Sequence, residues 1–171
     1  LKDHVVLLAY NEISYEIASH YQSKGERVLL VDTDPEIIRH FEDQKESNVV
    51  PLYADFMDPS IWVDFKFNQA KLVVSCRGLL DTNLELAEHM GQTPDIPYVA
   101  VTTSHEDALV LYEKGLRYVL QTDYVASKSF RKVFAEEIDK PAGDSFQDKG
   151  AAHWKDTRAI RDGLGEIFKF V

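Results

Sequence analysis

The chain has 171 residues, of which 44% are hydrophobic and 28% charged, enough apolar material for one folded domain of ordinary size. Its formal net charge of −10 argues against nucleic acid as a partner, because so acidic a chain repels phosphate backbones. Cys76 is the single cysteine, so an internal disulfide framework is excluded and a reducing compartment is expected. No apolar stretch approaches the roughly 20 residues of a membrane span, and no segment resembles a signal peptide.

Short runs rich in Val, Leu and Ile recur along the chain and predict β-strands. Runs that are apolar throughout are typical of strands buried on both faces, and therefore of a parallel sheet. Six such runs are present, at His4–Ala9, Arg27–Asp32, Val49–Tyr53, Lys71–Cys76, Pro97–Thr102 and Arg117–Gln121.

The segments between these runs have helical periodicity, as in the first of them, where Ile13, Ile17 and Tyr21 recur every four residues. The predicted helices begin near Ile13, Asp34, Asp58, Leu80 and Ala108, and a sixth covers about Ala126–Ile138. This alternation predicts a doubly wound, mostly parallel six-stranded α/β sheet of the Rossmann type with helices on both faces. Ligands of such sheets bind at the carboxyl ends of the strands.

Three segments are expected along the chain. Residues 1–139 form the Rossmann-like domain. Residues 140–150 form a linker, because the run 140–145 (Lys-Pro-Ala-Gly-Asp-Ser) is rich in turn residues. Residues 151–171 resume an apolar pattern interrupted by Gly163 and Gly165, which predicts a C-terminal appendage that is partly helical.

The first strand-to-helix turn is where a dinucleotide-binding domain places its glycine-rich phosphate loop. Here that stretch is Ala9-Tyr10-Asn11-Glu12-Ile13-Ser14, in which all three glycine positions are replaced. The replacements are small or tolerant of turns, Asn11 in particular because asparagine accepts positive φ better than most residues. Glu12 places a carboxylate near the expected phosphate. The stretch therefore predicts either a weakened nucleotide site or a turn that has no ligand.

Two acids lie at the ends of neighbouring predicted strands. Asp32, followed by Thr33, ends the second strand about twenty residues beyond the loop, where an acid accepts hydrogen bonds from a ribose diol. A capping or solvated turn acid is the alternative interpretation. Asp55, followed by Phe56, comes just after the third strand on the expected ligand side. These four residues are candidates for nucleotide binding.

The fourth strand ends in Ser75-Cys76-Arg77, which completes the set of candidates. Arg77 is the one basic residue at the carboxyl end of a predicted strand, so it is the local candidate for an anionic ligand group. Ion pairs with Asp55 or Asp81 are its structural alternative. Asn83, one turn into the next helix, is expected at the same rim. The loop Thr102–Asp107 is expected to cap the following helix rather than to bind a ligand.

Little in the sequence indicates an enzyme. Cys76 at a buried strand end is typical of an inert packing residue. The six histidines lack metal-ligand spacing, and neither a nucleophile elbow nor a P-loop is present. A small NAD(P)-dependent oxidoreductase remains the weakest alternative, because no segment resembles a substrate domain. We therefore expect no catalytic residues and no metal.

Several segments, in order, resemble TrkA-N domains, also called RCK N-terminal domains. They are His4–Ala18, Val31–Glu36, Tyr53–Pro59, Lys71–Ser75, Asp81–Leu84, His105–Ala108 and Gly115–Val119. The combination of Tyr53-Ala-Asp55 with the later His105-Glu-Asp-Ala-Leu109 is most similar to the cytoplasmic domain of Kef-type cation:proton antiporters. The resemblance covers about residues 3–138.

The resemblance implies a regulatory domain that forms a homodimer and binds an adenine nucleotide, either AMP, ATP or NAD(H), to gate exchange of potassium or sodium for protons. It implies a position at the cytoplasmic face of the inner membrane, joined to the membrane domain of the same polypeptide. That the chain begins at Leu1 rather than Met agrees with this expectation. Carried over to this chain, the phosphate turn falls on Ala9, Asn11 and Ser14. The missing glycines argue against a pyrophosphate. They favour AMP over NAD as the ligand. The alternative is that the domain binds no ligand and serves as a dimerisation scaffold.

Overall fold

The computed structural model describes residues 2–43, 48–93 and 95–129. The residues up to Gln121 form one unit, and the helix over 122–129 that follows is described by itself. This helix begins before the predicted start at Ala126. The rest of the sixth predicted helix, the linker 140–150 and the appendage 151–171 lie outside the described residues.

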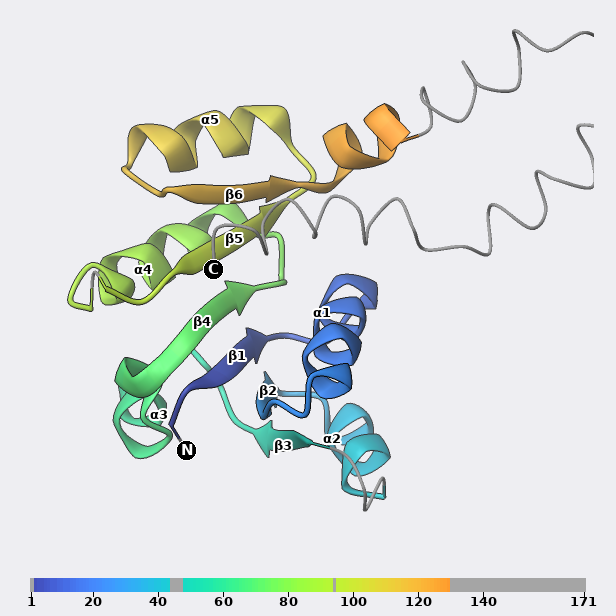
Figure 1. Cartoon of the computed structure of the whole chain (residues 1–171). Coiled ribbons are helices and arrows are strands. Elements are labelled where there is room, and N and C mark those ends of the chain that lie inside the picture. Colours follow the sequence, from blue (N-terminus) through green and yellow to red (C-terminus); the bar gives the residue numbers. More distant parts are fainter. Residues whose placement is uncertain (1, 44–47, 94, 130–171) are drawn as a thin grey trace, which may run out of the picture. The chain divides into compact units, whose positions relative to one another are not determined.

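The unit alternates strands and helices in the predicted order (Figure 1). The strands are β1 (His4–Leu8), β2 (Val28–Asp32), β3 (Val49–Tyr53), β4 (Ala70–Ser75), β5 (Tyr98–Thr102) and β6 (Tyr118–Gln121). The helices are α1 (Glu12–Ser23), α2 (Pro35–Glu42), α3 (Pro59–Asp64), α4 (Leu80–Met90) and α5 (His105–Glu113), with a 3₁₀ turn, η1 (Phe67–Gln69), after α3.

The six strands form one sheet with the order β3-β2-β1-β4-β5-β6, and every neighbouring pair is parallel. This is the Rossmann strand order, in which the chain reverses direction across the sheet between β1 and β4. The predicted doubly wound α/β fold is therefore confirmed, and within the described residues the sheet is wholly parallel. All carboxyl ends lie at one edge, and the topological switch point lies between β1 and β4.

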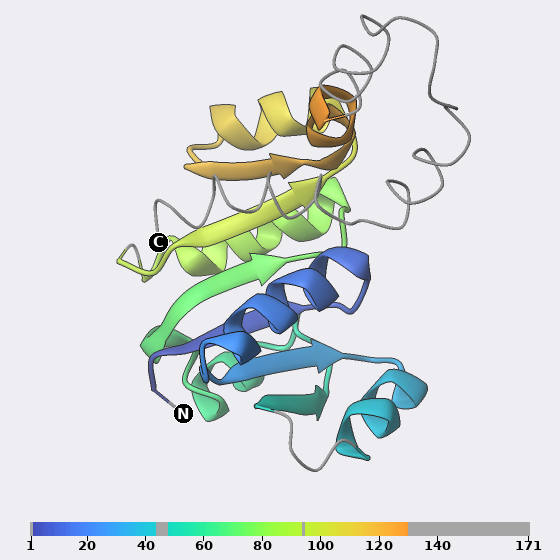
Figure 2. The same ribbon diagram turned by 45° about the vertical axis from the view of Figure 1, so that its right-hand side comes forward.

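The helices cover both faces of the sheet: α1 and α2 one face, and α3, α4 and α5 the other (Figures 1 and 2). On the second face, alternate strand residues such as Val6 and Leu8 pack against Phe67, Leu86 and Leu111. On the first face α1 buries Ile17, Ala18 and Tyr21, on the side that their spacing predicts. The sheet thus has a packed core on each side, which fixes the turns at its carboxyl edge.

The edge strands are less buried than their apolar sequences predict. In β3, Val50 is 42% exposed and Tyr53 is 62% exposed, and β6 is only partly buried. The reason is that an edge strand has a neighbour on one side only. Pro51 fits there, because a residue without an N–H group is tolerated in an edge strand, and β3 is at the edge of the sheet that the described residues form.

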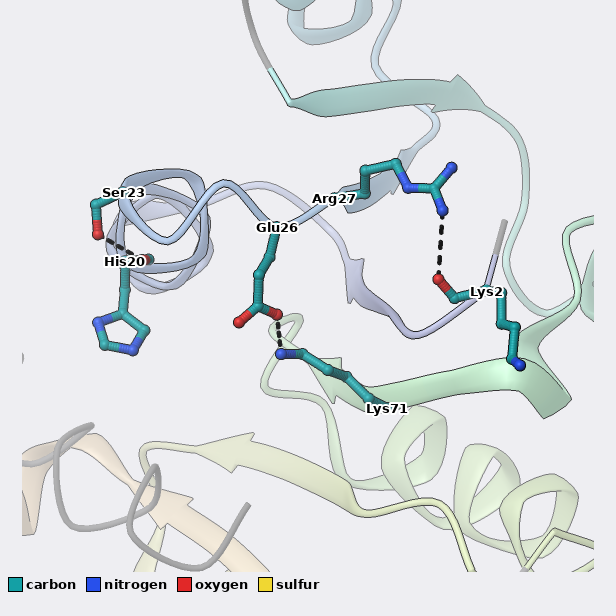
Figure 3. Close-up of polar contacts among 6 residues, drawn as sticks. All are labelled: Lys2, His20, Ser23, Glu26, Arg27 and Lys71. Atoms are coloured by element: carbon teal, nitrogen blue, oxygen red, sulfur yellow. Dashed lines mark hydrogen bonds and ion pairs between the residues drawn. The ribbon is translucent and has the colours of Figure 1, made fainter.

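Polar contacts fix the opposite, amino edge of the sheet (Figure 3). The Lys71 ammonium forms an ion pair with Glu26 and lies 4.5 Å from the centre of the Tyr21 ring. Arg27 Nη2 donates to the Lys2 carbonyl at 3.4 Å. Both members of the ion pair are partly exposed, and such a pair contributes at most about 1 kcal/mol. This cluster therefore joins α1 to the strands and lies away from the predicted ligand edge.

Candidate functional site at the carboxyl edge of the sheet

The turn between β1 and α1 is built around a left-handed residue, but that residue is Ala9. Its φ is +72°, and its N–H donates to the Val31 carbonyl at 2.9 Å. Asn11, which the sequence favoured for this conformation, has φ −161° and is the N-cap of α1. The expectation for Asn11 was wrong, because the chain turns directly after β1 ends at Leu8, and the residue at that point, Ala9, takes the positive φ.

Replacing Ala9 by glycine should stabilise the protein. Glycine adopts positive φ without the steric cost of a Cβ, which is about 1–2 kcal/mol, although it also gains freedom in the unfolded chain. We expect the free energy of unfolding in urea to rise by about 0.5–1 kcal/mol. Ala18→Gly, at a buried position inside α1, is the matched control and should lower it by about 1 kcal/mol. A loss of stability in Ala9→Gly would show that the packing of the Ala9 methyl group outweighs the strain.

The N–H groups of this turn are bonded to the protein's own side chains. The Asn11 and Ser14 side chains cap α1 reciprocally. Asn11 Oδ1 accepts from the Ile13 and Ser14 N–H groups, both at 3.0 Å, and Ser14 Oγ accepts from the Asn11 N–H at 2.7 Å. The Tyr10 N–H donates to Asp32 Oδ2 at 2.7 Å. The spacing of Asn11 and Ser14 is that of a capping box, so the sequence itself carries the signal for this cap.

Asp32 lies where the ribose-binding acid was predicted, at the end of β2 beside this turn. It is 9% exposed, and its second oxygen, Oδ1, accepts from the Asp34 N–H at 2.9 Å. Asp34 caps α2 as predicted, accepting from the Glu36 N–H at 2.8 Å. Thr33 is exposed between the two acids. Two backbone donors thus hold the Asp32 carboxylate, and each oxygen keeps a lone pair for a further donor.

The end of β4 is joined to the same turn. Asn11 Nδ2 donates to the Cys76 carbonyl at 2.6 Å, and the Cys76 N–H donates to the Leu8 carbonyl at 2.9 Å. The side chains of Ser75 and Cys76 are buried. Burial raises the pKa of the Cys76 thiol to about 12, so the thiol stays protonated and is a poor nucleophile. A ligand meets only the backbone at these two positions.

Arg77, the next residue, is exposed, and its guanidinium carbon lies 5.9 Å from the centre of the Phe56 ring. In the part of the chain that the structure describes, no ion pair joins it to Asp55 or Asp81. The Phe56 side chain is 1% exposed, so it packs against Arg77 from the core side and does not reach the surface. The guanidinium is therefore available to an anionic group.

The remaining candidates have local roles. Asp55 is exposed and accepts from the Met57 N–H at 3.0 Å, which closes its own turn. Glu12 is exposed in the first turn of α1. Asn83, expected at the rim, is fully buried, and its Nδ2 donates to the Val101 carbonyl at 2.9 Å, so that expectation was wrong. Ser104 caps α5 as predicted, accepting from the Asp107 N–H at 3.1 Å.

Two sets of hydrogen bonds, Tyr10–Asp32 and Ser14–Asn11–Cys76, thus meet at the Tyr10–Asn11 peptide bond and form one unit beside the switch point. This unit offers a fixed carboxylate for hydroxyl groups, and Arg77 offers a cation for an anion. Among the described residues, no cluster of His, Cys, Asp or Glu is suited to hold a metal ion. The arrangement is suited to binding a polar ligand.

The family model of the TrkA-N domain matches residues 5–122. The solved TrkA-N domain of the inner membrane protein ybaL from Escherichia coli is similar, with a TM-score of 0.70 and 13% identity over 78% of this chain and 97% of that one. No curated protein matches at a significant level.

Some of the similar structures were solved with a nucleotide bound, among them the GsuK channel with ADP. The Kef CTD of Shewanella denitrificans in its AMP-bound form has a TM-score of 0.59 at 14% identity, over 97% of this chain and 90% of that one. The GsuK channel bound to NAD has a TM-score of 0.61 at 15% identity, over 70% of this chain but only 21% of that one. At these identities the likeness establishes the fold alone.

Within the described residues no helix is both long and apolar enough to cross a bilayer.

Proposed function

Because the chain belongs to the TrkA-N domain family, we propose that it is the nucleotide-sensing regulatory domain of a potassium or other cation:proton antiporter. The ligand is an adenine nucleotide, AMP before NAD(H), bound at the carboxyl edge of the sheet. The domain works as a homodimer joined to the membrane domain of its own polypeptide, at the cytoplasmic face of the inner membrane. It has no catalytic role.

The Asp32 carboxylate is the observation that carries this proposal. It lies at the end of β2, next to the switch point, where Rossmann folds bind a ribose. The Tyr10 and Asp34 N–H groups hold it at 2.7 and 2.9 Å, so a ribose diol meets an acceptor that is already oriented. A carboxylate held this way loses little freedom on binding.

Arg77 is the proposed partner of the phosphate group of the ligand. It is exposed at the end of β4, two strands from Asp32 across β1. Neighbouring strands are about 4.8 Å apart, so the ends of β2 and β4 are separated by roughly 10 Å. A nucleoside monophosphate and an arginine side chain together span such a distance. A phosphate at Arg77 would gain a charge-assisted bond.

Regulation follows if the nucleotide binds the conformations of an open and a closed transporter with different affinities. The free energy available for gating is then the difference between the two binding free energies. The solved relatives that contain AMP, ADP and NAD support a nucleotide as the ligand of this fold.

A thermal-melt screen with AMP, ADP, ATP, NAD and NADH tests the proposal. At about one hundred times its dissociation constant a ligand adds roughly 2.7 kcal/mol, which raises Tm by about 5–10 °C in a domain of this size. We expect such a shift with AMP, and its loss in Asp32→Ala when each variant is compared with its own unliganded Tm. Ser104→Ala is the control, since it removes a helix cap at the β5–α5 connection and should keep the shift. No shift with any nucleotide at millimolar concentration would contradict the proposal.

A ligand-free dimerisation scaffold is the second candidate. The observation in its favour is that four N–H groups in the turn after β1, those of Tyr10, Asn11, Ile13 and Ser14, already bond to the protein's own side chains. A dimer in gel filtration that is indifferent to every nucleotide would support it.

A further inference from the structure

The cap of α1 occupies the place where a dinucleotide-binding loop receives its pyrophosphate. We infer that the Asn11 and Ser14 side chains occupy the anion-binding part of this loop themselves and thereby determine which nucleotide the protein binds. Their side chains exclude a pyrophosphate and leave room for a nucleotide whose phosphate reaches Arg77. The inference rests on the proposed function in one respect: the ligand binds at the same edge of the sheet.

The argument begins with the donors. Phosphate loops bind anions through unpaired N–H groups at the start of a helix. Here the N–H groups of Tyr10, Asn11, Ile13 and Ser14 donate to side-chain oxygens within 3.0 Å. The Tyr15 N–H donates to the Asn11 carbonyl, as in any first helical turn. A pyrophosphate therefore meets four donors that are already in use, and among the described residues the Glu12 N–H is the one donor of the helix start that has no such bond.

The Asn11 side chain is also held from its other end. Its Nδ2 donates to the Cys76 carbonyl at 2.6 Å, at a residue that is itself buried. Moving this side chain aside breaks three hydrogen bonds at once, two at Oδ1 and one at Nδ2. A glycine at this position would have neither interaction. The side chain thus joins the turn after β1 to the end of β4.

Charge acts in the same direction. Glu12 is exposed in the first turn of α1, where the helix dipole would otherwise favour a phosphate. Asp32 lies on the other side of the turn. A pyrophosphate between these two carboxylates is repelled by both, whereas a single phosphate at Arg77 lies beside an exposed cation.

Isothermal titration with AMP and NAD tests the inference in the wild type and in Asn11→Gly/Ser14→Gly. In the wild type we expect NAD to bind at least about tenfold more weakly than AMP. In the double variant NAD should gain about tenfold or more, because freed N–H groups then bond to a charged acceptor. The AMP affinity should change by less than about threefold. Ser104→Gly removes an unrelated helix cap and should leave both affinities unchanged.

Amide hydrogen exchange of the unliganded wild type is independent of how the variant folds. We expect the Ile13 and Ser14 amides to exchange about tenfold or more slowly than the Glu12 amide, because their bonds to Asn11 Oδ1 must open first. Equal exchange at the three amides would overturn the inference.

Equal affinities of the wild type for NAD and AMP would also overturn it, as would a double variant that gains nothing for NAD. Where the wild type binds AMP, either result leaves the proposed nucleotide sensing intact. If the wild type binds neither nucleotide but the double variant gains NAD, the inference stands and the proposed AMP site fails.

Discussion

Phe67→Ala is expected to lower the free energy of unfolding by about 3–5 kcal/mol. Phe67 lies in η1, between α3 and β4, and its side chain is 1% exposed. Its ring packs against Trp62 with the centroids 4.9 Å apart, and Trp62 in turn lies 5.4 Å from His89 on α4. The substitution removes buried apolar surface and an aromatic contact, and it leaves a cavity that the sheet cannot close.

Urea unfolding monitored by circular dichroism measures this loss. Tyr15→Ala is the matched control, since it removes an aromatic ring that is 52% exposed from a helix that tolerates alanine well. We expect its effect to stay within about 0.5 kcal/mol. A loss below about 1.5 kcal/mol for Phe67→Ala would mean that the α3–η1 crossover packs more loosely than described.

The fold was largely predictable because its signals are local. Each strand is a short apolar run, and Asp34 and Asp58 cap α2 and α3 with a proline following each of them. Hydrophobic periodicity and caps depend on neighbours along the chain, and the right-handed crossover rule then leaves few topologies. The exposure of β3 was missed because a strand's position at the edge of a sheet depends on distant segments.

The candidate site was predictable by position but not by conformation. The fold places Asp32 and Arg77 at the carboxyl edge, as expected. Which residue of the turn adopts positive φ depends on where β1 leaves the sheet, through the bond from the Ala9 N–H to the Val31 carbonyl. The link from Asn11 to the Cys76 carbonyl joins residues that are 65 positions apart, so no local pattern predicts it. Whether a polar side chain in α4 points to the rim or into the core likewise depends on packing. Asn83 was expected at the rim and is buried in the core.

Asn83→Leu is expected to lower the free energy of unfolding by about 2–3 kcal/mol. Asn83 is fully buried, donates to the Val101 carbonyl at 2.9 Å, and has both its side-chain and main-chain oxygens 3.4 Å from the Tyr98 hydroxyl. Burial raises the pKa of Tyr98 well above its usual value, so this hydroxyl stays protonated and needs an acceptor. Leucine has the same branched shape and the same number of heavy side-chain atoms but bulkier methyl groups, so the loss combines polar groups left unpaired in the core with some overpacking.

A double-mutant cycle with Tyr98→Phe separates this network from simple packing. Asn83→Leu removes the side-chain acceptor of the Tyr98 hydroxyl and keeps the main-chain carbonyl. Once the hydroxyl is gone, this part of the loss disappears, so the double variant should lose less than the sum of the two single losses, by about 0.5–1.5 kcal/mol. Additive losses would show that the two side chains do not share a hydrogen bond in solution. Because Asn83 joins α4 to β5, and α4 begins three residues after Arg77, a coupled network here would also fix the position of the cation at the carboxyl edge. We therefore expect Asn83→Leu to weaken AMP binding as well as to lower the free energy of unfolding. Phe67→Ala, in η1 just before the start of β4 and so away from the carboxyl edge, should affect stability alone.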